Sequence, residues 1–163
     1  MSNKTITRIA TKLQDYPKPS KTSVGPTIRT SGSNSVVNRQ HVQLIDKNGD
    51  ITYVTGTYQT GGGSGYKLLI YTVFECITDE ITDDLVVIFE YPQNHTQTAS
   101  FKLAEKKLKK MTKDHKNIKV MNWEQYEKWV TRWQKKNPVG SFPRKRASVT
   151  KNSVVTTKKS RKK

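Results

Sequence analysis

Residues 85–115 have the sequence LVVIFEYPQNHTQTASFKLAEKKLKKMTKDH, and the change of pattern within them decides the fold class. The stretch opens with an apolar run of strand length, 85–91, which predicts a buried central strand. From residue 101 onward, apolar side chains recur at steps of three and four residues, the spacing of one face of a helix. The members of that face are Phe101, Ala104, Leu108, Met111 and His115. The stretch therefore predicts a strand followed by an amphipathic helix.

Toward the N-terminus, a turn signal separates two further strands. Asn48-Gly49 is a strong hairpin signal, because both residues tolerate the positive φ angles of a tight turn. We expect strands at about 37–46 and 50–59 on either side of it. The segment 66–78, YKLLIYTVFECIT, is rich in aromatic and β-branched residues, which favours a long third strand.

Toward the C-terminus, the pattern predicts a short strand and a second helix. Residues 118–121 are apolar at alternate positions, as in a strand. Asn122 is a favoured N-cap and Gln125 follows three residues later, so a helix should begin here and end before Pro138. The expected fold class is α+β: a four- to five-stranded antiparallel or mixed sheet in the order β-β-β-β-α-β-α, with the two C-terminal helices on one face.

Composition restricts the class of protein and its partners. The 163 residues include 30 Lys and Arg against 13 Asp and Glu, and the net charge of +17 makes polyanions such as DNA and RNA the expected partners. Only 33% of the residues are hydrophobic, below the ~45–50% typical of globular domains. Part of the chain should therefore remain unfolded.

The sequence also indicates a compartment. A single cysteine, Cys76, excludes a disulfide within the chain and a cysteine-rich zinc site. Residues 1–13 are polar, and no apolar stretch approaches the ~20 residues of a membrane-spanning helix. We therefore expect no signal peptide, no membrane partner, and a location in the nucleus, the cytoplasm or a virion.

Charge is distributed unevenly along the chain. The net charge is +5 over residues 1–35, −5 over 36–98, +8 over 99–136 and +9 over 137–163. A folded core with polyanion-binding arms has this asymmetry. We expect a disordered basic N-terminal arm at 1–35, one folded domain at 36–136 and a disordered basic tail at 137–163.

The N-terminal arm contains one feature that points to a helix. Ile6, Ile9 and Leu13 fall at helical spacing. A helix this short is marginal in isolation, so we expect it to form only on a partner.

The helix predicted at 101–115 is the first candidate binding site. Like charges three or four residues apart repel, so a lysine face is easiest to explain if it meets phosphates. A solvated helix face is the alternative. The candidate residues are Lys102, Lys106, Lys109, Lys110, Lys113 and Lys116.

The C-terminal tail is the second candidate site. Its two basic clusters are typical of a nucleic-acid-binding arm and of a bipartite nuclear localisation signal, which would add a nuclear import receptor as a partner. The clusters consist of Arg144, Lys145, Arg146, Lys158, Lys159, Arg161, Lys162 and Lys163.

The helix that follows Asn122 carries four aromatic residues, Trp123, Tyr126, Trp129 and Trp133. Aromatics at helical spacing are most often core residues. Trp129 lies off the centre of the stripe, and an exposed ring beside basic groups stacks on nucleobases. Trp129 is therefore the candidate base-stacking residue.

Acidic residues offer a possible metal site, although the sequence implies no cofactor. Glu75, Asp84 and Glu90 lie near predicted strand ends, where carboxylates can hold Mg²⁺ for phosphodiester hydrolysis. The alternative is a solvated acidic turn. His41, His95 and His115 lack metal-ligand spacing, and no nucleophilic triad is apparent, so no catalytic residue is assigned.

These features predict a protein that binds DNA or RNA through the phosphate backbone, largely without sequence specificity. A structural packaging protein, such as a small viral coat protein or nucleoprotein, would have the same composition. A metal-dependent nuclease is the second alternative, and the only enzyme class that the sequence supports.

Overall fold

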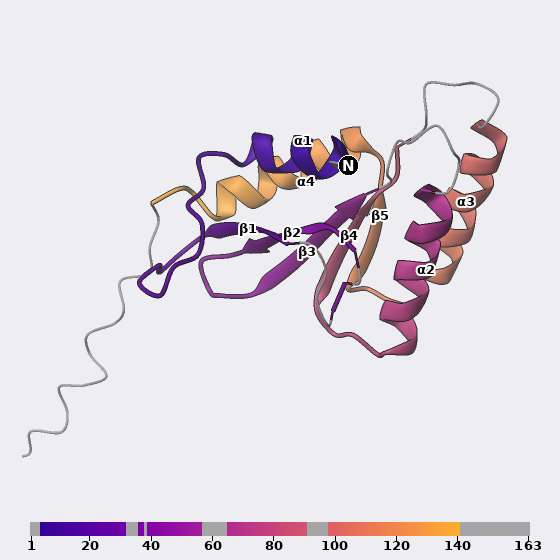
Figure 1. Ribbon diagram of the computed structural model, residues 1–163, viewed down its shortest axis with the longest axis horizontal. Helices are drawn as coiled ribbons and strands as arrows, with labels where there is room; N and C mark the ends of the chain where they lie inside the picture. Colours follow the sequence, from indigo (N-terminus) through magenta and orange to yellow (C-terminus); the bar gives the residue numbers. More distant parts are fainter. Residues whose placement is uncertain (1–3, 32–35, 38, 57–64, 91–97, 141–163) are drawn as a thin grey trace, which may run out of the picture.

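The structure is a computed structural model that describes residues 4–31, 36–37, 39–56, 65–90 and 98–140. Four helices and five strands lie within these ranges (Figure 1). In chain order they are α1 (Lys4–Lys12), β1 (Thr27–Ser31), β2 (His41–Ile45), β3 (Ile51–Gly56), α2 (Gly65–Thr78), β4 (Asp84–Ile88), α3 (Thr98–Met111), β5 (Ile118–Met121) and α4 (Trp123–Lys136).

The strands form one mixed sheet in the order β1-β2-β3-β4-β5. β1, β2 and β3 form an antiparallel meander, whereas β3, β4 and β5 are parallel. The α+β class and the mixed five-stranded sheet are as predicted. β2 is shorter than expected, residues 57–59 of the range expected for β3 lie outside the described residues, and β4 and β5 lie where the apolar runs placed them.

Local signals at two boundaries act as predicted. In the β2–β3 turn, Gly49 has a φ of 90° and its N–H donates to the Asp46 carbonyl over 3.0 Å. At the start of α4, the Asn122 side chain accepts from the Gln125 N–H, and the Gln125 side chain accepts in return from the Asn122 N–H. Each interaction satisfies backbone groups that the turn or the helix end would otherwise leave unpaired.

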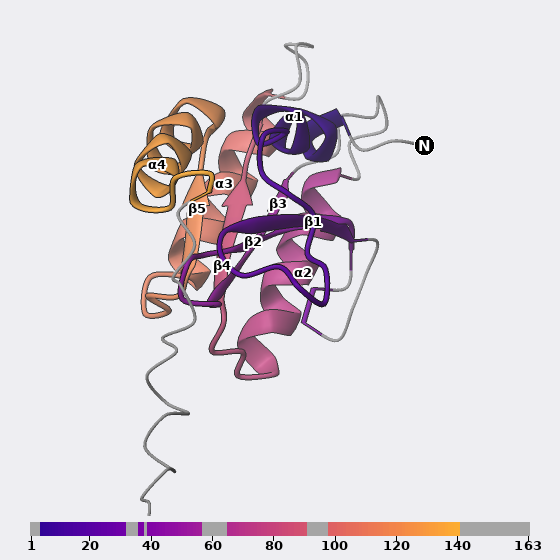
Figure 2. The same cartoon turned by 90° about the vertical axis from the view of Figure 1, so that its left-hand side faces the viewer.

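Helices cover both faces of the sheet, with α1 and α4 on one face and α2 and α3 on the other (Figures 1 and 2). β4 supplies both cores, because Val86 and Ile88 point to the α1/α4 side while Leu85 and Val87 point to the α2/α3 side. The expectation that the two C-terminal helices share a face is wrong. α2 connects the parallel strands β3 and β4, and α3 connects the parallel strands β4 and β5. Crossovers of the same hand place their helices on the same face of the sheet, whereas α4 follows the last strand and packs on the opposite face.

The segment 66–78 forms helix α2, so the prediction of a long strand there is wrong. Its buried residues Leu69, Val73 and Cys76 recur at helical spacing and pack in the α2/α3 core. The prediction relied on composition, and strand propensity depends strongly on tertiary context. Parallel pairing of β3 with β4 requires a crossover connection between them, and α2 provides it.

The N-terminal segment is part of the folded domain, so the prediction of a disordered arm over 1–35 is wrong for residues 4–31. Ile6 and Ile9 on α1 and Leu13 just after it are buried in the same core as α4, and β1 pairs with β2 along its length. The helical spacing of the three residues was a correct signal. Packing supplies the stability that a nine-residue helix lacks alone.

Candidate nucleic-acid interface

The lysine face predicted on α3 is exposed. The helix ends at Met111, earlier than expected, and the last two lysines of the set lie in the turn that leads to β5. Lys109 pairs with Glu105 over 3.0 Å. The exposed members are Lys102, Lys106, Lys109, Lys110, Lys113 and Lys116. Because Phe101, Ala104 and Leu108 occupy the core side of α3, its lysines point away from the core.

Edge strand β5 divides its side chains between the two faces of the sheet. Ile118 and Val120 pack in the α2/α3 core, whereas Met121 packs on the α1/α4 side. Alternation along a strand places Lys119 on the same side as Met121, beside α4. The lysine face of α3 and the exposed face of α4 therefore border the same sheet edge from opposite sides.

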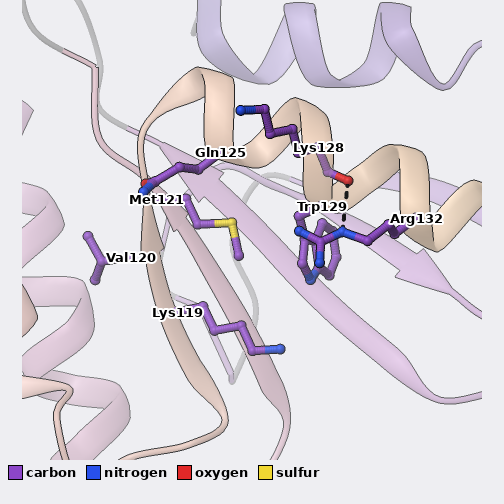
Figure 3. Close-up of a pocket in the computed structure, with 7 residues that line it drawn as sticks. All are labelled: Lys119, Val120, Met121, Gln125, Lys128, Trp129 and Arg132. Carbon is purple, nitrogen blue, oxygen red and sulfur yellow. Dashed lines mark hydrogen bonds between the residues drawn. The ribbon is translucent and has the colours of Figure 1, made fainter.

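A groove of about 400 Å³ lies between β5 and α4 (Figure 3). We call it the α4 groove. Trp129 lies within it, partly buried against the α1/α4 core and close to the ring of Tyr126, at a centroid distance of 6.0 Å. The lining residues are Lys119, Val120, Met121, Gln125, Lys128, Trp129 and Arg132.

The α4 groove is cationic. Lys119, Lys128 and Arg132 line it, and no acidic side chain does. Arg132 Nε donates to the Lys128 carbonyl over 3.3 Å (Figure 3). Lys128 also pairs with Glu124 over 2.9 Å, but both side chains are largely exposed, so this pair contributes little stability and can exchange for a phosphate.

The cationic surface continues on the other side of Lys128 and Arg132. There a second hollow is lined by Lys12 of α1 together with Glu127 and Thr131 of α4. Lys12 pairs with Glu127 over 3.3 Å. Hydrogen bonds from Trp123 and Lys12 lower the pKa of the Glu127 carboxyl, so it remains ionised and compensates Lys12. The unopposed positive charge is therefore on the β5 side of α4.

Arg8 joins α1 to the rest of the domain and explains the position of Glu90. Its guanidinium forms an ion pair with the buried Glu90 carboxylate and lies 3.7 Å from the centre of the Trp123 ring. Thr5 Oγ1 donates to the second carboxylate oxygen of Glu90 over 2.7 Å. Glu90 thus holds α1 against the end of β4.

The predicted acidic residues do not converge. Asp84 begins β4 and Glu90 follows its end, so six residues of extended chain, roughly 20 Å, separate them. Carboxylates that share a Ca²⁺ or Mg²⁺ each approach it within about 2.6 Å, so these two cannot hold one ion. Glu75 lies on α2, and the described part of the chain contains no group of three or more Asp, Glu, His or Cys placed to hold a metal.

The structure brings together some of the predicted residues and adds others. Trp129 is partly exposed, as expected for its position off the stripe, while Tyr126 and Trp133 are core residues. Three cations share the groove with Trp129 and were not predicted. They are Lys119, Lys128 and Arg132. Arg132 lies three residues after Trp129 and four after Lys128, which was a signal for a shared helix face.

Two predicted features lie outside the described residues. One is His95. The other is the pair of basic clusters in the tail, Arg144, Lys145, Arg146, Lys158, Lys159, Arg161, Lys162 and Lys163.

The chain matches no known protein family model, no curated protein and no solved structure. Among the helices that the structure describes, none is long and apolar enough to cross a membrane. The geometry of the α4 groove and of the lysine face therefore carries the functional argument.

Proposed function

We propose that the protein binds nucleic acid along the β5 edge, with phosphates on the lysine face of α3 and in the α4 groove. Trp129 stacks on an unpaired base, so the preferred ligand is single-stranded DNA or RNA. The basic clusters of the tail add backbone contacts. Binding is largely independent of sequence, because phosphate contacts position a nucleic acid without specifying it.

The observation that carries this proposal is the position of Trp129 among Lys119, Lys128 and Arg132 in one groove. Proteins that bind single strands combine a cationic groove for the backbone with aromatic rings for the bases. A tryptophan that served only the core would not require three cations and no acidic side chain in the lining of its groove. The proposal also explains why α3 tolerates so many lysines on one face.

Fluorescence anisotropy of the full-length protein with a labelled single strand and with the matching duplex tests the proposal. Stacking contributes about 1–3 kcal/mol per base, so Trp129→Ala should weaken single-strand binding roughly 5- to 150-fold. Duplex binding should change less, because paired bases are not available to the ring. Trp129→Phe retains an aromatic face and should recover most of the affinity.

Two controls separate the groove from general effects. Thermal unfolding of Trp129→Ala shows whether loss of its packing against the core contributes. Lys47→Gln in the β2–β3 turn removes the same charge as Lys128→Gln but lies outside the groove, so only the groove variant should weaken binding beyond the effect of net charge. Equal losses for both lysines, or unchanged single-strand binding by Trp129→Ala, would contradict the proposed groove.

A packaging role would use the same contacts and would differ in assembly. In that case the protein would form discrete particles that retain nucleic acid. Light scattering of protein mixed with a long single strand distinguishes the two, because a simple binding protein gives complexes whose size follows the amount added.

A further inference from the structure

Helix α2 presents an apolar face to solvent. Leu68, Tyr71 and Phe74 are each more than half exposed, although their neighbours Leu69 and Val73 are fully buried. In addition, Leu103 on the adjacent helix α3 is 55% exposed. Scattered apolar residues on a surface are ordinary, but three on one helix face with a fourth on the next helix form a patch that needs an occupant.

The sequence of this face is symmetric about Tyr71. Leu68 and Phe74 lie three residues on either side of Tyr71, and the charged residues Lys67 and Glu75 lie four residues on either side. At ~100° per residue the five positions span about 120° of the helix circumference, centred on Tyr71. If a second copy of α2 packed antiparallel with the two-fold axis at Tyr71, apolar residues of one copy would therefore lie level with apolar residues of the other, and charged residues with charged residues.

Charge favours that antiparallel arrangement. With the axis at Tyr71, Lys67 of one copy lies level with Glu75 of the other, and the reverse pair forms at the opposite end. Like charges are kept apart, because Lys67 and its own copy are separated by eight residues of helix, about 12 Å. A parallel arrangement would instead place each lysine beside its copy.

The side chains on the face are already arranged for this contact. Lys67 is exposed, and Glu75 is held near the face because its carboxylate accepts a hydrogen bond from the Tyr71 hydroxyl, which raises the pKa of Tyr71. The tyrosine therefore stays neutral at physiological pH and can pack against its symmetry mate. Self-complementary patches of this kind are what a two-fold dimer requires.

The size of the patch sets the expected strength. A whole aromatic side chain offers about 150–250 Å², so half-exposed Tyr71 and Phe74 contribute roughly 100 Å² each, to which the smaller Leu68 and Leu103 add. A standard interface buries about 800 Å² per partner. The apolar centre with its charged rim therefore fits a weak dimer, with a dissociation constant in roughly the micromolar range.

We propose that the exposed face of α2 is a homodimer interface, in which two copies pack antiparallel about Tyr71 with Lys67 of each copy opposite Glu75 of the other. The α4 groove lies on the opposite face of the sheet and remains open in this dimer (Figure 2). Dimerisation and nucleic-acid binding are separate properties, and either can hold without the other.

Sedimentation velocity of the full chain, freed of nucleic acid and measured over a concentration series, tests the interface. The wild-type chain should shift from monomer to dimer. Lys67→Glu places two glutamates level with each other at each end, as does Glu75→Lys with two lysines, and each should weaken the dimer about tenfold at low salt. The double swap Lys67→Glu/Glu75→Lys restores opposite charges and should recover the wild-type dissociation constant.

Two further variants complete the test. Tyr71→Lys places two cations at the two-fold axis and should abolish the dimer, whereas Lys47→Glu in the β2–β3 turn carries the same charge change as Lys67→Glu and should not affect it. Thermal unfolding checks that each variant is folded. A chain that stays monomeric throughout, or a dimer that ignores Tyr71→Lys and the charge swaps, would overturn the proposal, as would a double swap no tighter than the single variants.

Discussion

Ile9→Ala tests whether α1 is a structural part of the domain or a detachable basic arm. Ile9 is fully buried in the core that α1 and α4 share with the sheet, and its side chain loses three carbon groups in the substitution. At ~0.8 kcal/mol per buried group, the transfer cost is about 2.4 kcal/mol, and the cavity adds to it. We expect a loss of about 3 kcal/mol, which lies within the range of about 2–5 kcal/mol measured for such substitutions.

Urea unfolding followed by far-UV circular dichroism measures this loss. Thr11→Ala is the matched control, because Thr11 lies on the exposed side of the same helix and surface substitutions usually change stability by less than about 0.5 kcal/mol. If α1 were an arm that folds only on nucleic acid, both variants would have wild-type stability. An Ile9→Ala loss no larger than that of Thr11→Ala would therefore refute the placement of α1 in the core.

Three further predictions concern the lysine face, a helix cap and the cysteine. Replacing Lys106, Lys110 and Lys113 together by Gln should reduce the slope of log affinity against log salt by about 2–3, at roughly 0.7–0.9 per lost phosphate contact, as titrations between 50 and 200 mM salt would show. Asn122→Ala removes the side-chain acceptor of the capping box, leaves the Asn122 N–H bond to the Gln125 side chain in place, and should cost about 1 kcal/mol in urea unfolding. Burial raises the pKa of the Cys76 thiol from 9.0 to about 11, so at pH 8 its thiolate population falls roughly 100-fold; labelling by a thiol reagent should be slower by about that factor than in denaturant.

Local patterns in the sequence predicted the elements whose signals do not depend on tertiary context. The Asn48-Gly49 turn, the apolar run of β4 and the Asn122 cap are each decided within a few residues. The segment of α2 is different, since Tyr, Val, Ile and Thr favour a strand in isolation. The need for a crossover between parallel strands overrides that preference, and no local pattern reveals which strands are parallel.

The N-terminus shows how low hydrophobicity can mislead. Residues 14–26 carry few apolar side chains, and the whole segment 1–35 was therefore predicted to be disordered. Ile6, Ile9 and Leu13 nevertheless pack in the core that α1 and α4 share with the sheet, so three well-spaced residues can anchor the segment when a partner surface exists in the same chain. The spacing was visible in the sequence, but the surface that receives it was not.

The sequence predicted the lysine face of α3 but not the α4 groove, because only the groove depends on how the elements pack. The exposure of the α3 lysines follows from helical periodicity alone. The groove around Trp129 depends on β5 placing Lys119 beside α4, which requires knowledge of the face on which α4 packs. No local pattern places α3 and α4 on opposite faces, so the sequence alone could not show that their cations border one strand edge.

Acidic and basic side chains occupy different parts of the fold, and the best-placed acidic residue of the net-negative segment 36–98 has a structural role. Glu90 is used to hold Arg8 and Thr5, and Asp84 lies at the other end of β4. The cations of α3, β5 and α4, in contrast, border a single edge of the sheet. Asp84 and Glu90 therefore do not form the shared metal site considered for a metal-dependent nuclease, and the basic edge of the sheet is the feature on which the proposed binding role rests.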